Sequence, residues 1–283
     1  MERPVVMITG AAVGFGRGLA RVFARGGFDL ALVDKRPELT DTVEVTEGFG
    51  ATVHSTQGDV TDDDVLRGFV DTTLDRFGRI DVLINNAGEV RFTPVDLPIA
   101  RAIDDLESLW RVNTRAPFVL GRLVMPHMIE RGDGHIINIA TDHMHTCGFP
   151  VVLAHEPDST CQWASAPRRP VGAATFDVYD SSKWALNGFT QAWSLALRRH
   201  GVRVNNVCIG ATDSHMMRQA IETARGRPAT PEEIASWMPT DDVAEIVLEL
   251  HREGPTGRSG DNVGIWLGHE IVLPPPHPVM TGR

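Results

Sequence analysis

The amino-acid sequence predicts an α/β protein, in which a doubly wound parallel sheet of about seven strands carries helices on both faces. Two observations support this prediction. Short apolar runs rich in valine and isoleucine alternate with segments of helical periodicity along the whole chain. The first apolar run leads directly into a glycine-rich turn and a helix. Because neither an internal repeat nor a low-complexity linker divides the sequence, we expect residues 1–283 to form a single domain.

The first strand is predicted over residues 4–9, and a helix over residues 17–25 follows it. Between the strand and the first turn of the helix lie four glycines: Gly10, Gly14, Gly16 and Gly18. Glycines let the backbone approach a pyrophosphate, and the helix N-terminus supplies N–H groups and a positive dipole. A second strand, 29–34, ends in Asp34, which is 18 residues after Gly16 and near the spacing of a ribose-binding carboxylate. This arrangement is typical of a Rossmann-like dinucleotide-binding unit.

The remaining elements follow from apolar runs and helix caps. Strands are predicted at 52–57, 81–84, 135–140, 202–207 and 262–267. Helices are predicted at 62–77 with Thr61 as the N-cap, at 104–128, from 179 to 200, and at 241–250, and a capping box begins another at Thr230. Asn113 lies inside the helix at 104–128, where asparagine has poor propensity. Either it faces solvent, or its side chain or displaced backbone serves a buried site.

Composition narrows the classes of partner. The formal net charge is -10, which argues against a nucleic-acid partner, because the phosphate backbone attracts a basic face. The three cysteines are too few for a disulfide framework, and we expect a reducing cytoplasm. We expect neither a signal peptide nor a membrane span, since no apolar run is long enough to cross a bilayer.

Tyr179 and Lys183 stand four residues apart on a predicted helix, so both side chains project from one face. Tyr179 is the only tyrosine of the chain. Bringing a phenol from a pKa near 10 to about 7 takes roughly 4 kcal/mol. One cation about 4 Å away, at an effective dielectric constant of about 20, supplies about that much. The pair suits a general acid/base at neutral pH, although a solvated lysine beside a half-buried tyrosine would give the same spacing.

With these residues in place, the chain resembles the short-chain dehydrogenase/reductase family over nearly its whole length. The run Thr9-Gly10-Ala11-Ala12-Val13-Gly14-Phe15-Gly16 is similar to the cofactor turn of that family. Asp59-Val60 resembles its adenine-contacting pair, and Asn85-Asn86-Ala87-Gly88 resembles its Asn-Asn-Ala-Gly signature. Asn113 matches its helix asparagine, and Tyr179 with Lys183 matches its Tyr-x-x-x-Lys motif.

The resemblance implies a nicotinamide-dependent oxidoreductase that acts on CH–OH groups, with a role for each matching residue. The implied catalytic residues are Asn113, Thr141, Tyr179 and Lys183. The implied cofactor-binding residues are Gly10, Val13, Gly14, Phe15, Gly16, Asp34, Asp59, Val60, Asn86, Ala87, Gly88, Lys183, Gly210, Thr212 and Ser214. A homotetramer or a homodimer is expected from the same resemblance.

The chain departs from the family pattern at three places. Thr141 stands where the family usually has serine, so the hydroxyl is kept and a methyl group is added. Tyr179 follows Thr141 by 38 residues, against little more than a dozen in the family, so about two dozen residues are inserted within 142–178. After the sixth strand, Ile209-Gly210 replaces Pro-Gly, and Ser214 replaces a threonine.

The mechanism implied is reversible hydride transfer between the nicotinamide and the carbinol carbon of a secondary alcohol. Tyr179 would exchange the hydroxyl proton, and Lys183 would lower the pKa of the phenol and hold the ribose. Thr141 would hydrogen-bond the substrate oxygen, and Asn113 would anchor a water that relays the proton. Asp34 favours NAD over NADP, because a carboxylate accepts the 2′-hydroxyl and repels a 2′-phosphate. Lys35 and Arg36, next in sequence, leave NADP open, whereas Val13 precedes Gly14 where NADP-preferring relatives often have a basic residue.

The inserted segment 142–178 is expected to be a substrate lid. Its candidate pocket walls, which could equally pack on the segment itself, are Phe149, Val151, Val152, Leu153 and Trp163. Its histidines and cysteines match no standard zinc spacing, so we expect no metal. Glu89 and Arg91 could edge the pocket or form a surface ion pair. A short helix that carries Met216, Met217 and Ile221 would cover the nicotinamide.

Residues 269–283 form a C-terminal extension that contains three consecutive prolines. We expect it to lie along a neighbouring subunit or to stay mobile. Two alternative functions are an NADP-dependent carbonyl reductase and a non-catalytic NAD-sensing protein, since fold does not fix function. A small alcohol or ketone is the expected substrate. The segment 142–178 points to one larger than a simple alcohol.

Overall fold

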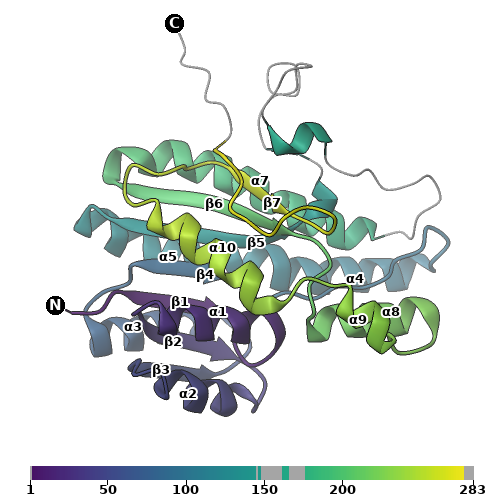
Figure 1. Cartoon of the computed structure of the whole chain (residues 1–283), viewed down its shortest axis with the longest axis horizontal. Helices are drawn as coiled ribbons and strands as arrows, with labels where there is room; N and C mark the ends of the chain where they lie inside the picture. The colour runs from purple at the N-terminus through teal and green to yellow at the C-terminus, as the bar shows by residue number, and fades with distance from the viewer. Residues whose placement is uncertain (1, 145, 148–160, 166–175, 277–283) are drawn as a thin grey trace, which may run out of the picture.

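The computed structural model describes residues 2–144, 146–147, 161–165 and 176–276. Its centre is a sheet of seven parallel strands in the order β3-β2-β1-β4-β5-β6-β7, which confirms the predicted architecture (Figure 1). The strands are β1 (Val5–Thr9), β2 (Asp29–Asp34), β3 (Val53–Gln57), β4 (Val82–Asn85), β5 (Gly134–Thr141), β6 (Val202–Ile209) and β7 (Asn262–Ile265).

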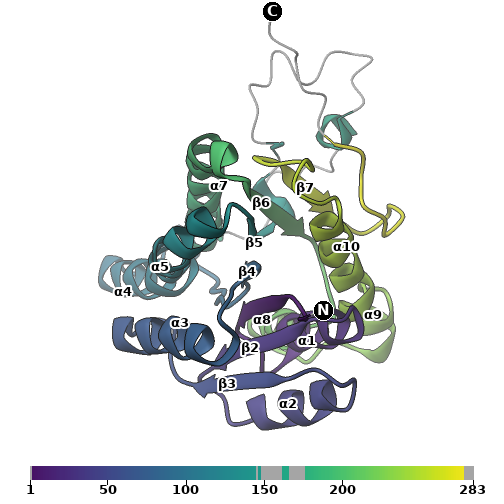
Figure 2. The same cartoon turned by 90° about the vertical axis from the view of Figure 1, so that its left-hand side faces the viewer.

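Helices cover both faces of the sheet, as the end-on view shows (Figure 2). On one face lie α1 (Gly14–Arg25), α2 (Leu39–Glu47) and α10 (Thr240–Arg252). On the other lie α3 (Asp63–Phe77), α5 (Ala116–Arg131) and α7 (Asp177–Leu197). At the carboxyl ends of the strands lie α4 (Ile99–Trp110), α8 (His215–Arg225) and α9 (Pro231–Ala235). No helix in the described part of the chain is long and apolar enough to cross a membrane.

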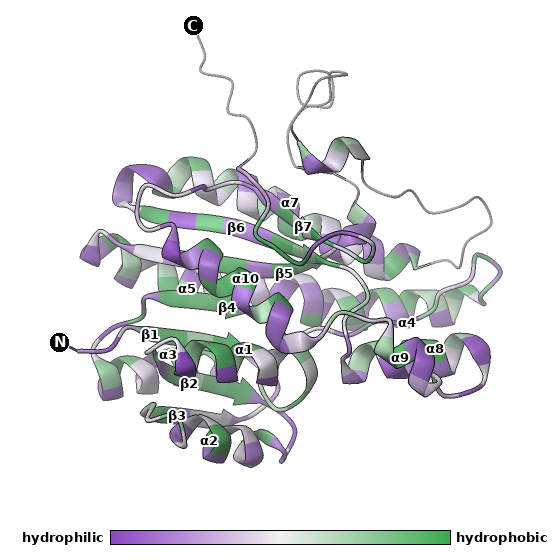
Figure 3. Ribbon diagram, viewed as in Figure 1, coloured by the Kyte–Doolittle hydropathy of each residue, from purple (hydrophilic) through white to green (hydrophobic). Residues whose placement is uncertain are grey.

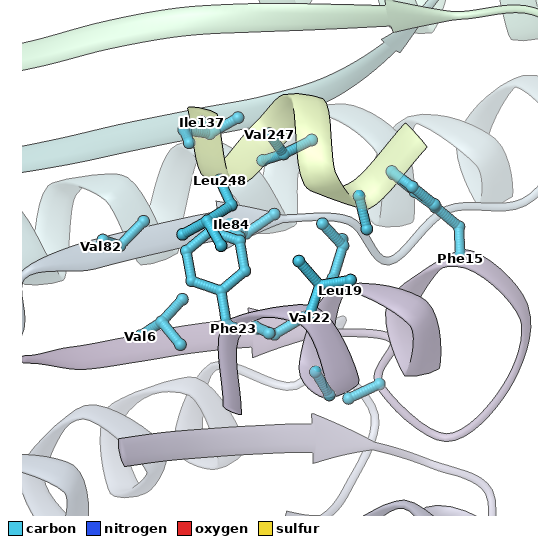
Figure 4. Close-up of a cluster of buried hydrophobic side chains, with 14 of the residues drawn as sticks. Val6, Phe15, Leu19, Val22, Phe23, Val82, Ile84, Ile137, Val247 and Leu248 are labelled. Carbon is cyan, nitrogen blue, oxygen red and sulfur yellow. The ribbon is translucent and has the colours of Figure 1, made fainter. Parts of the chain in front are cut away.

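Strand alternation divides the core into two layers. Val6 and Ile8 on β1 join the cluster under α1 and α10, whereas Met7 between them joins the cluster under α3 and α5. Successive strand residues point to opposite faces, and here both faces are covered, so β1, β2 and β4 are mostly continuous apolar runs, whereas β5 and β6 also carry buried polar residues. Figure 3 shows mostly green central strands, with purple bands in β6, between helices of mixed colour. In Figure 4, Phe23 and Leu248 bring α1 and α10 together over β1 and β4.

A ladder of buried asparagines fixes the register of four neighbouring strands. Asn85, Asn138, Asn206 and Asn262 are paired across β4, β5, β6 and β7. The Asn85 amide donates to Asn138 at 2.9 Å, and the Asn206 amide donates to Asn262 at 2.7 Å. Between these pairs, the Thr190 hydroxyl on α7 accepts from Asn138 and donates to Asn206. A shift of the strand register by one residue would leave these groups without hydrogen-bond partners, so the ladder specifies one register.

Several predicted boundaries were wrong. The helix predicted at 104–128 is α4 and α5 joined by a π-helical turn, η1 (Arg111–Arg115), around Asn113. The N-cap of α3 is Asp62, whose carboxylate accepts from the Asp64 N–H, and Thr61 instead donates to Asp59. The helix α2 was not predicted, because its few apolar residues give weak periodicity. The capping box at Thr230 is confirmed.

One described part of segment 142–178, residues 161–165, is fastened to the edge strand β7. Gln162 and Trp163, on the short helix η3 (Gln162–Ser165), donate to the carbonyl oxygens of Gly264 and Asn262 at 2.5 and 2.8 Å. These two carbonyls alternate with the residues that bond β6, so they point away from the sheet. The segment therefore covers acceptors that an exposed edge would otherwise offer.

The C-terminal extension does not leave the body of the chain within its described part. Ile271 and Leu273 pack against the core under α1 and α10. Arg258 donates to the carbonyl oxygen of Pro274 at 2.9 Å. Up to residue 276 the extension thus makes contacts with its own chain, and its placement along another subunit stays a prediction.

Candidate active site

A cavity of about 780 Å³ opens at the carboxyl ends of the strands. In a parallel sheet this edge gathers the turns that follow the strands, and here β1 and β4 lie on either side of the crossover point. Most predicted site residues line the cavity: Gly10, Val13, Gly14, Phe15, Gly16, Asp34, Asp59, Val60, Asn86, Ala87, Gly88, Tyr179, Lys183 and Ser214. The predicted residues Asn113, Thr141, Gly210 and Thr212 are not among those that line it.

The glycine-rich turn after β1 is built for close backbone approach. A Cβ on Gly16 would lie 1.9 Å from the carbonyl oxygen of Gly10, so no other residue fits there without moving the turn. The turn after β4 is fastened to it. Asn86 donates its side-chain amide to the carbonyl oxygens of Thr9 and Gly10, and the Thr9 hydroxyl accepts from two backbone N–H groups of the β4 turn.

Asp34 ends β2 at the cavity wall and braces the same turn. One carboxylate oxygen accepts from the Ala12 N–H and the other from the Arg36 N–H, each at 2.9 Å. Each oxygen keeps a second lone pair, so the carboxylate can still accept ribose hydroxyls. Lys35 is held by Glu89 at 3.0 Å and Asp59 at 3.8 Å. The Arg36 guanidinium also lines the cavity, and no described residue forms an ion pair with it.

Thr141 and Tyr179 are brought together by the end of β5 and the first turn of α7. Their hydroxyl groups are hydrogen-bonded, and this bond lowers the pKa of the phenol. Burial acts in the opposite direction and more strongly, so the pKa of Tyr179 lies well above 10. The carboxylates of Asp180 and Asp142 raise it further.

Lys183 lies one turn along α7 and is 4% exposed. Its Nζ donates to the carbonyl oxygen of Ile139 at 2.8 Å, and burial lowers its pKa to about 8. The expected lowering of the phenol pKa by Lys183 is not among the principal influences on Tyr179 in the cofactor-free protein. Desolvation outweighs it, because both groups are buried.

Asn113 is fully buried, so it does not face solvent. Its Nδ2 donates to the Glu89 carbonyl at 2.9 Å and to the Ser182 hydroxyl at 3.0 Å, and its Oδ1 accepts from the Glu89 N–H at 2.9 Å. The side chain is thus used to fasten the β4 turn to α7. The π-helical turn η1 displaces the backbone at this residue.

Beyond β6, Gly210 and Thr212 shape a turn. The Thr212 hydroxyl donates to the Gly210 carbonyl at 3.0 Å, and the residue is 3% exposed. Ser214 caps α8, and its hydroxyl accepts from the Met217 N–H. On that helix Met216 lines the cavity, whereas Met217 and Ile221 do not. Glu89 and Arg91 line it as well as forming an ion pair, so both predicted alternatives hold.

Sequence reasoning missed several residues around Tyr179. Phe92 and Phe176 line the cavity and meet edge to face at 5.8 Å. His143 bonds Asp180 at 2.8 Å, and its ring meets the Tyr179 ring at 6.2 Å. The available signal was adjacency, since Phe176, His143 and Asp180 lie within three positions of Thr141 or Tyr179, and Phe92 lies four positions after Gly88.

Of the residues in segment 142–178 that were predicted to form pocket walls, Trp163 alone lies in the described part of the chain. Trp163 is not on the described cavity wall. It packs on Trp266 at 5.1 Å, in a cluster that also contains the three buried cysteines Cys147, Cys161 and Cys208. Phe149, Val151, Val152 and Leu153 lie outside the described residues. Among the residues that the structure does describe, no group of three candidate ligands could hold a metal ion.

The sheet, the glycine turn and the buried tyrosine–lysine pair at the mouth of the cavity define a dinucleotide-binding oxidoreductase. A family model described as short chain dehydrogenase matches residues 4–150 and 168–225, and the chain belongs to this family. The match omits residues 151–167, which lie inside the predicted insertion.

Similar proteins cover most of the chain. The 3-oxoacyl-[acyl-carrier-protein] reductase FabG of Thermotoga maritima is 27% identical over 94% of this chain and 97% of its own. The uncharacterized oxidoreductase YxjF of Bacillus subtilis is 31% identical over 78% of this chain and 76% of its own. The crystal structure of levodione reductase aligns with a TM-score of 0.77 at 24% identity, over 94% of this chain and 96% of that one, which shows likeness of fold. A metagenomic short-chain oxidoreductase in complex with NADP aligns with a TM-score of 0.69 at 26% identity, over 95% and 99% of the two chains.

Proposed function

We propose that this protein interconverts a secondary alcohol and a ketone, with Tyr179 as general acid/base and NAD as the cofactor. The single observation that carries the proposal is the buried pair Tyr179 and Lys183 on the wall of one cavity, with the Thr141 side chain bonded to the phenol. Such a cluster is suited to a reaction in which a proton is transferred to or from a buried substrate oxygen.

The glycine turn is the test of whether a dinucleotide fits. Gly10, Gly14 and Gly16 leave backbone exposed to the cavity, and the N-terminus of α1 points its free N–H groups there. Asp34 would hold the adenosine ribose, and Lys183 the nicotinamide ribose. When bound, the nicotinamide supplies the hydride acceptor or donor.

The protein side of the reaction is a proton transfer. Thr141 donates or accepts a hydrogen bond at the substrate oxygen and keeps it beside the phenol of Tyr179. Tyr179 takes the proton during oxidation and returns it during reduction. Lys183 keeps its ammonium within the same low-dielectric region, and Asn113 holds the β4 turn that closes the site from behind.

NAD is favoured because the Asp34 carboxylate faces the cavity and would repel a 2′-phosphate. NADP is the alternative, and Arg36 supports it, since its guanidinium lines the same cavity without an ion-pair partner among the described residues. An NADP-dependent carbonyl reductase is therefore the second candidate function. The ratio of kcat/KM for the two cofactors decides between them.

Tyr179→Phe tests the proposal. The variant should bind NAD as the wild type does, measured by quenching of protein fluorescence, and should lose turnover across a panel of secondary alcohols and ketones. Near-normal turnover in the variant would refute the assignment. Cofactor binding by the wild type without turnover on any panel member would indicate a non-catalytic NAD-sensing protein instead.

We further propose a homodimer formed by the helical face beside α7. Trp110 and Phe118 are 40% and 42% exposed and share a shallow hollow with Phe189. The edge of β7 is covered by Gln162 and Trp163, which disfavours association by strand pairing and hence a tetramer built that way. Light scattering should give a dimer, and Phe118→Glu should convert it to a monomer. A tetramer, or a dimer that the substitution leaves intact, would contradict this.

A further inference from the structure

His143 connects three parts of the candidate site. Its backbone N–H donates to the Thr141 hydroxyl at 3.3 Å, and its Nδ1 is 2.8 Å from the Asp180 carboxylate. Its ring stands nearly perpendicular to the Tyr179 ring, at 82° and 6.2 Å between centroids. The side chains of His143 and Asp180 are only 29% and 23% exposed, so the bond is largely shielded from water.

These contacts span the root of the inserted segment. His143 lies in the short helix η2 (Asp142–Met144) directly after β5, and Asp180 lies in the first turn of α7. The two residues are 37 positions apart in the sequence. A long connection constrains its ends less than a short one, so the spacing of Thr141 and Tyr179 needs contacts other than the connection itself.

We propose that His143, held by Asp180, is a positioning residue that aligns Thr141 with Tyr179 across the root of segment 142–178. The proposal rests on the function proposed above for these two hydroxyl groups. It assigns no contact with substrate to His143. The ring limits the tilt of the phenol, and the backbone N–H orients the threonine hydroxyl that bonds it.

The far side of the root is fastened by separate contacts. Thr93 bonds the Asp177 carboxylate, and residues 93 and 176 form a parallel bridge. Phe176 also packs against the His143 ring at 6.0 Å. The start of α7 is thereby fixed to the β4 turn, and His143 fixes it to the end of β5.

The charged and titratable groups around His143 are those of a catalytic centre. Asp142 lies beside His143 on η2, and Tyr179 and Asp180 lie on α7 in contact with its ring. Asp142, Asp180 and Cys208 of β6 in turn raise the pKa of Tyr179. Because a change of charge here would alter several groups together, the test uses neutral replacements and separates kcat from KM.

Four variants test the proposal with the best alcohol of the panel: His143→Ala, His143→Phe, Asp180→Leu and Asp180→Asn. His143→Ala and Asp180→Leu should lower kcat at least about tenfold, because sub-ångström misplacement of reacting groups is costly, while KM and the Kd for NAD change less than about twofold. His143→Phe keeps the ring but loses the bond and should fall in between. Asp180→Asn keeps an acceptor oxygen and should retain most of the activity.

A double-mutant cycle distinguishes positioning from general structural damage. If His143 acts through Thr141, the loss of kcat caused by His143→Ala should largely disappear in a Thr141→Ala background. Equal losses in both backgrounds, or an unchanged kcat in His143→Ala, would overturn the proposal. If His143→Ala does not fold, the comparison of Asp180→Leu with Asp180→Asn decides, and equal activity of those two overturns it.

Two control variants distinguish a failure of the positioning role from a failure of the proposed function. His54→Ala removes a comparable histidine, bonded to Thr72 at 2.9 Å at the edge strand β3, and should leave kcat unchanged. Tyr179→Phe reports on the proposed function itself. An inactive Tyr179→Phe with a fully active His143→Ala would refute only the positioning role, whereas an active Tyr179→Phe would refute the function.

Discussion

The Nζ of Lys183 lies against Gly88, in the turn that follows β4. A Cβ at residue 88 would be 3.3 Å from that nitrogen and 3.2 Å from the Oδ1 of Asn113. Lys183 is also held by the Ile139 carbonyl, so it has little room to retreat. The absence of a side chain at residue 88 therefore lets the β4 turn, the π-helical turn η1 and the helix α7 meet.

Gly88→Ala should lower turnover about tenfold, because the added methyl group displaces either the ammonium of Lys183 or the amide of Asn113 from its hydrogen bonds. The measurement is steady-state kcat together with the melting temperature. Gly68→Ala is the matched control, since a Cβ at that position of α3 meets nothing within 4 Å. The control should keep its activity, and an equally active Gly88→Ala would contradict the packing argument.

The single tyrosine makes the ionisation of the candidate catalytic group directly observable. Burial raises the pKa of Tyr179 above 10, so the cofactor-free protein should show no tyrosinate absorbance until the pH exceeds the value at which free tyrosine ionises. Thr141→Ala removes the hydrogen bond that lowers this pKa and should move the titration to still higher pH.

Saturating NAD should shift the titration of Tyr179 toward neutral pH, because the oxidised nicotinamide brings a positive charge into a low-dielectric site. Tyr179→Phe is the spectroscopic blank, since no other tyrosine is present. A titration that NAD leaves unmoved would refute the role of the bound ring in activating the phenol.

Much of the site could be predicted because its signals are local in sequence. The glycine turn, Asp34 and the Tyr179–Lys183 spacing each occupy one short stretch, and strand periodicity places those stretches at one edge of a parallel sheet. The electrostatics could not be predicted in the same way. The pKa of Tyr179 depends on how deeply the phenol and the ammonium are buried, and tertiary packing sets this burial.

What the sequence did not reveal depends on contacts between distant segments. The asparagine ladder needs the strand register before its members can be paired, and His143 meets Asp180 only after a 37-residue segment has closed. The edge contact of Trp163 is similar. Its hydrophobicity is visible in the sequence, but the choice between the substrate cavity and the edge of β7 is a tertiary one.

Cofactor preference should follow the charge at Asp34 and Arg36. Asp34→Asn removes the charge and keeps an acceptor oxygen, so the ratio of kcat/KM for NADP to that for NAD should rise about tenfold, the equivalent of one charge-assisted hydrogen bond. Arg36→Ala should lower the same ratio. Lys35→Ala is the control, because Glu89 and Asp59 already hold that ammonium. A ratio unchanged by Asp34→Asn would refute the assigned role.

The buried part of the asparagine ladder should contribute more to the free energy of unfolding than its half-exposed end does. Asn206→Ala leaves the Thr190 hydroxyl and the Asn262 Oδ1 without their bonds of 2.7 Å, which should cost about 2–4 kcal/mol of unfolding free energy in urea. Asn187, at the half-exposed end of the ladder, bonds Asn262 at 3.0 Å. Asn187→Ala should cost less than about 1 kcal/mol, because water can replace it. Equal costs at the two positions would show that the ladder is not a buried network.

The free energy of unfolding should fall as the pH drops from about 6.5 to about 4. The cause is two buried histidines near the amino ends of the strands, opposite the cavity. His135 is 1% exposed, and its ring stacks on His251 at 5.7 Å. Burial and the nearby Arg203 guanidinium lower the pKa of both, that of His251 to about 4. In the unfolded chain these groups bind protons near pH 6.5, whereas in the folded protein they stay neutral. The unfolded state therefore gains protons first, and each such group removes up to about 1.4 kcal/mol of stability per pH unit across this window.

Urea unfolding at several pH values should show this dependence of the unfolding free energy on pH, and His251→Gln should reduce it. The carboxylate of Asp81, whose pKa is lowered from 3.8, contributes only at lower pH. A slope that persists unchanged in both His251→Gln and His135→Gln would assign the acid sensitivity to other groups.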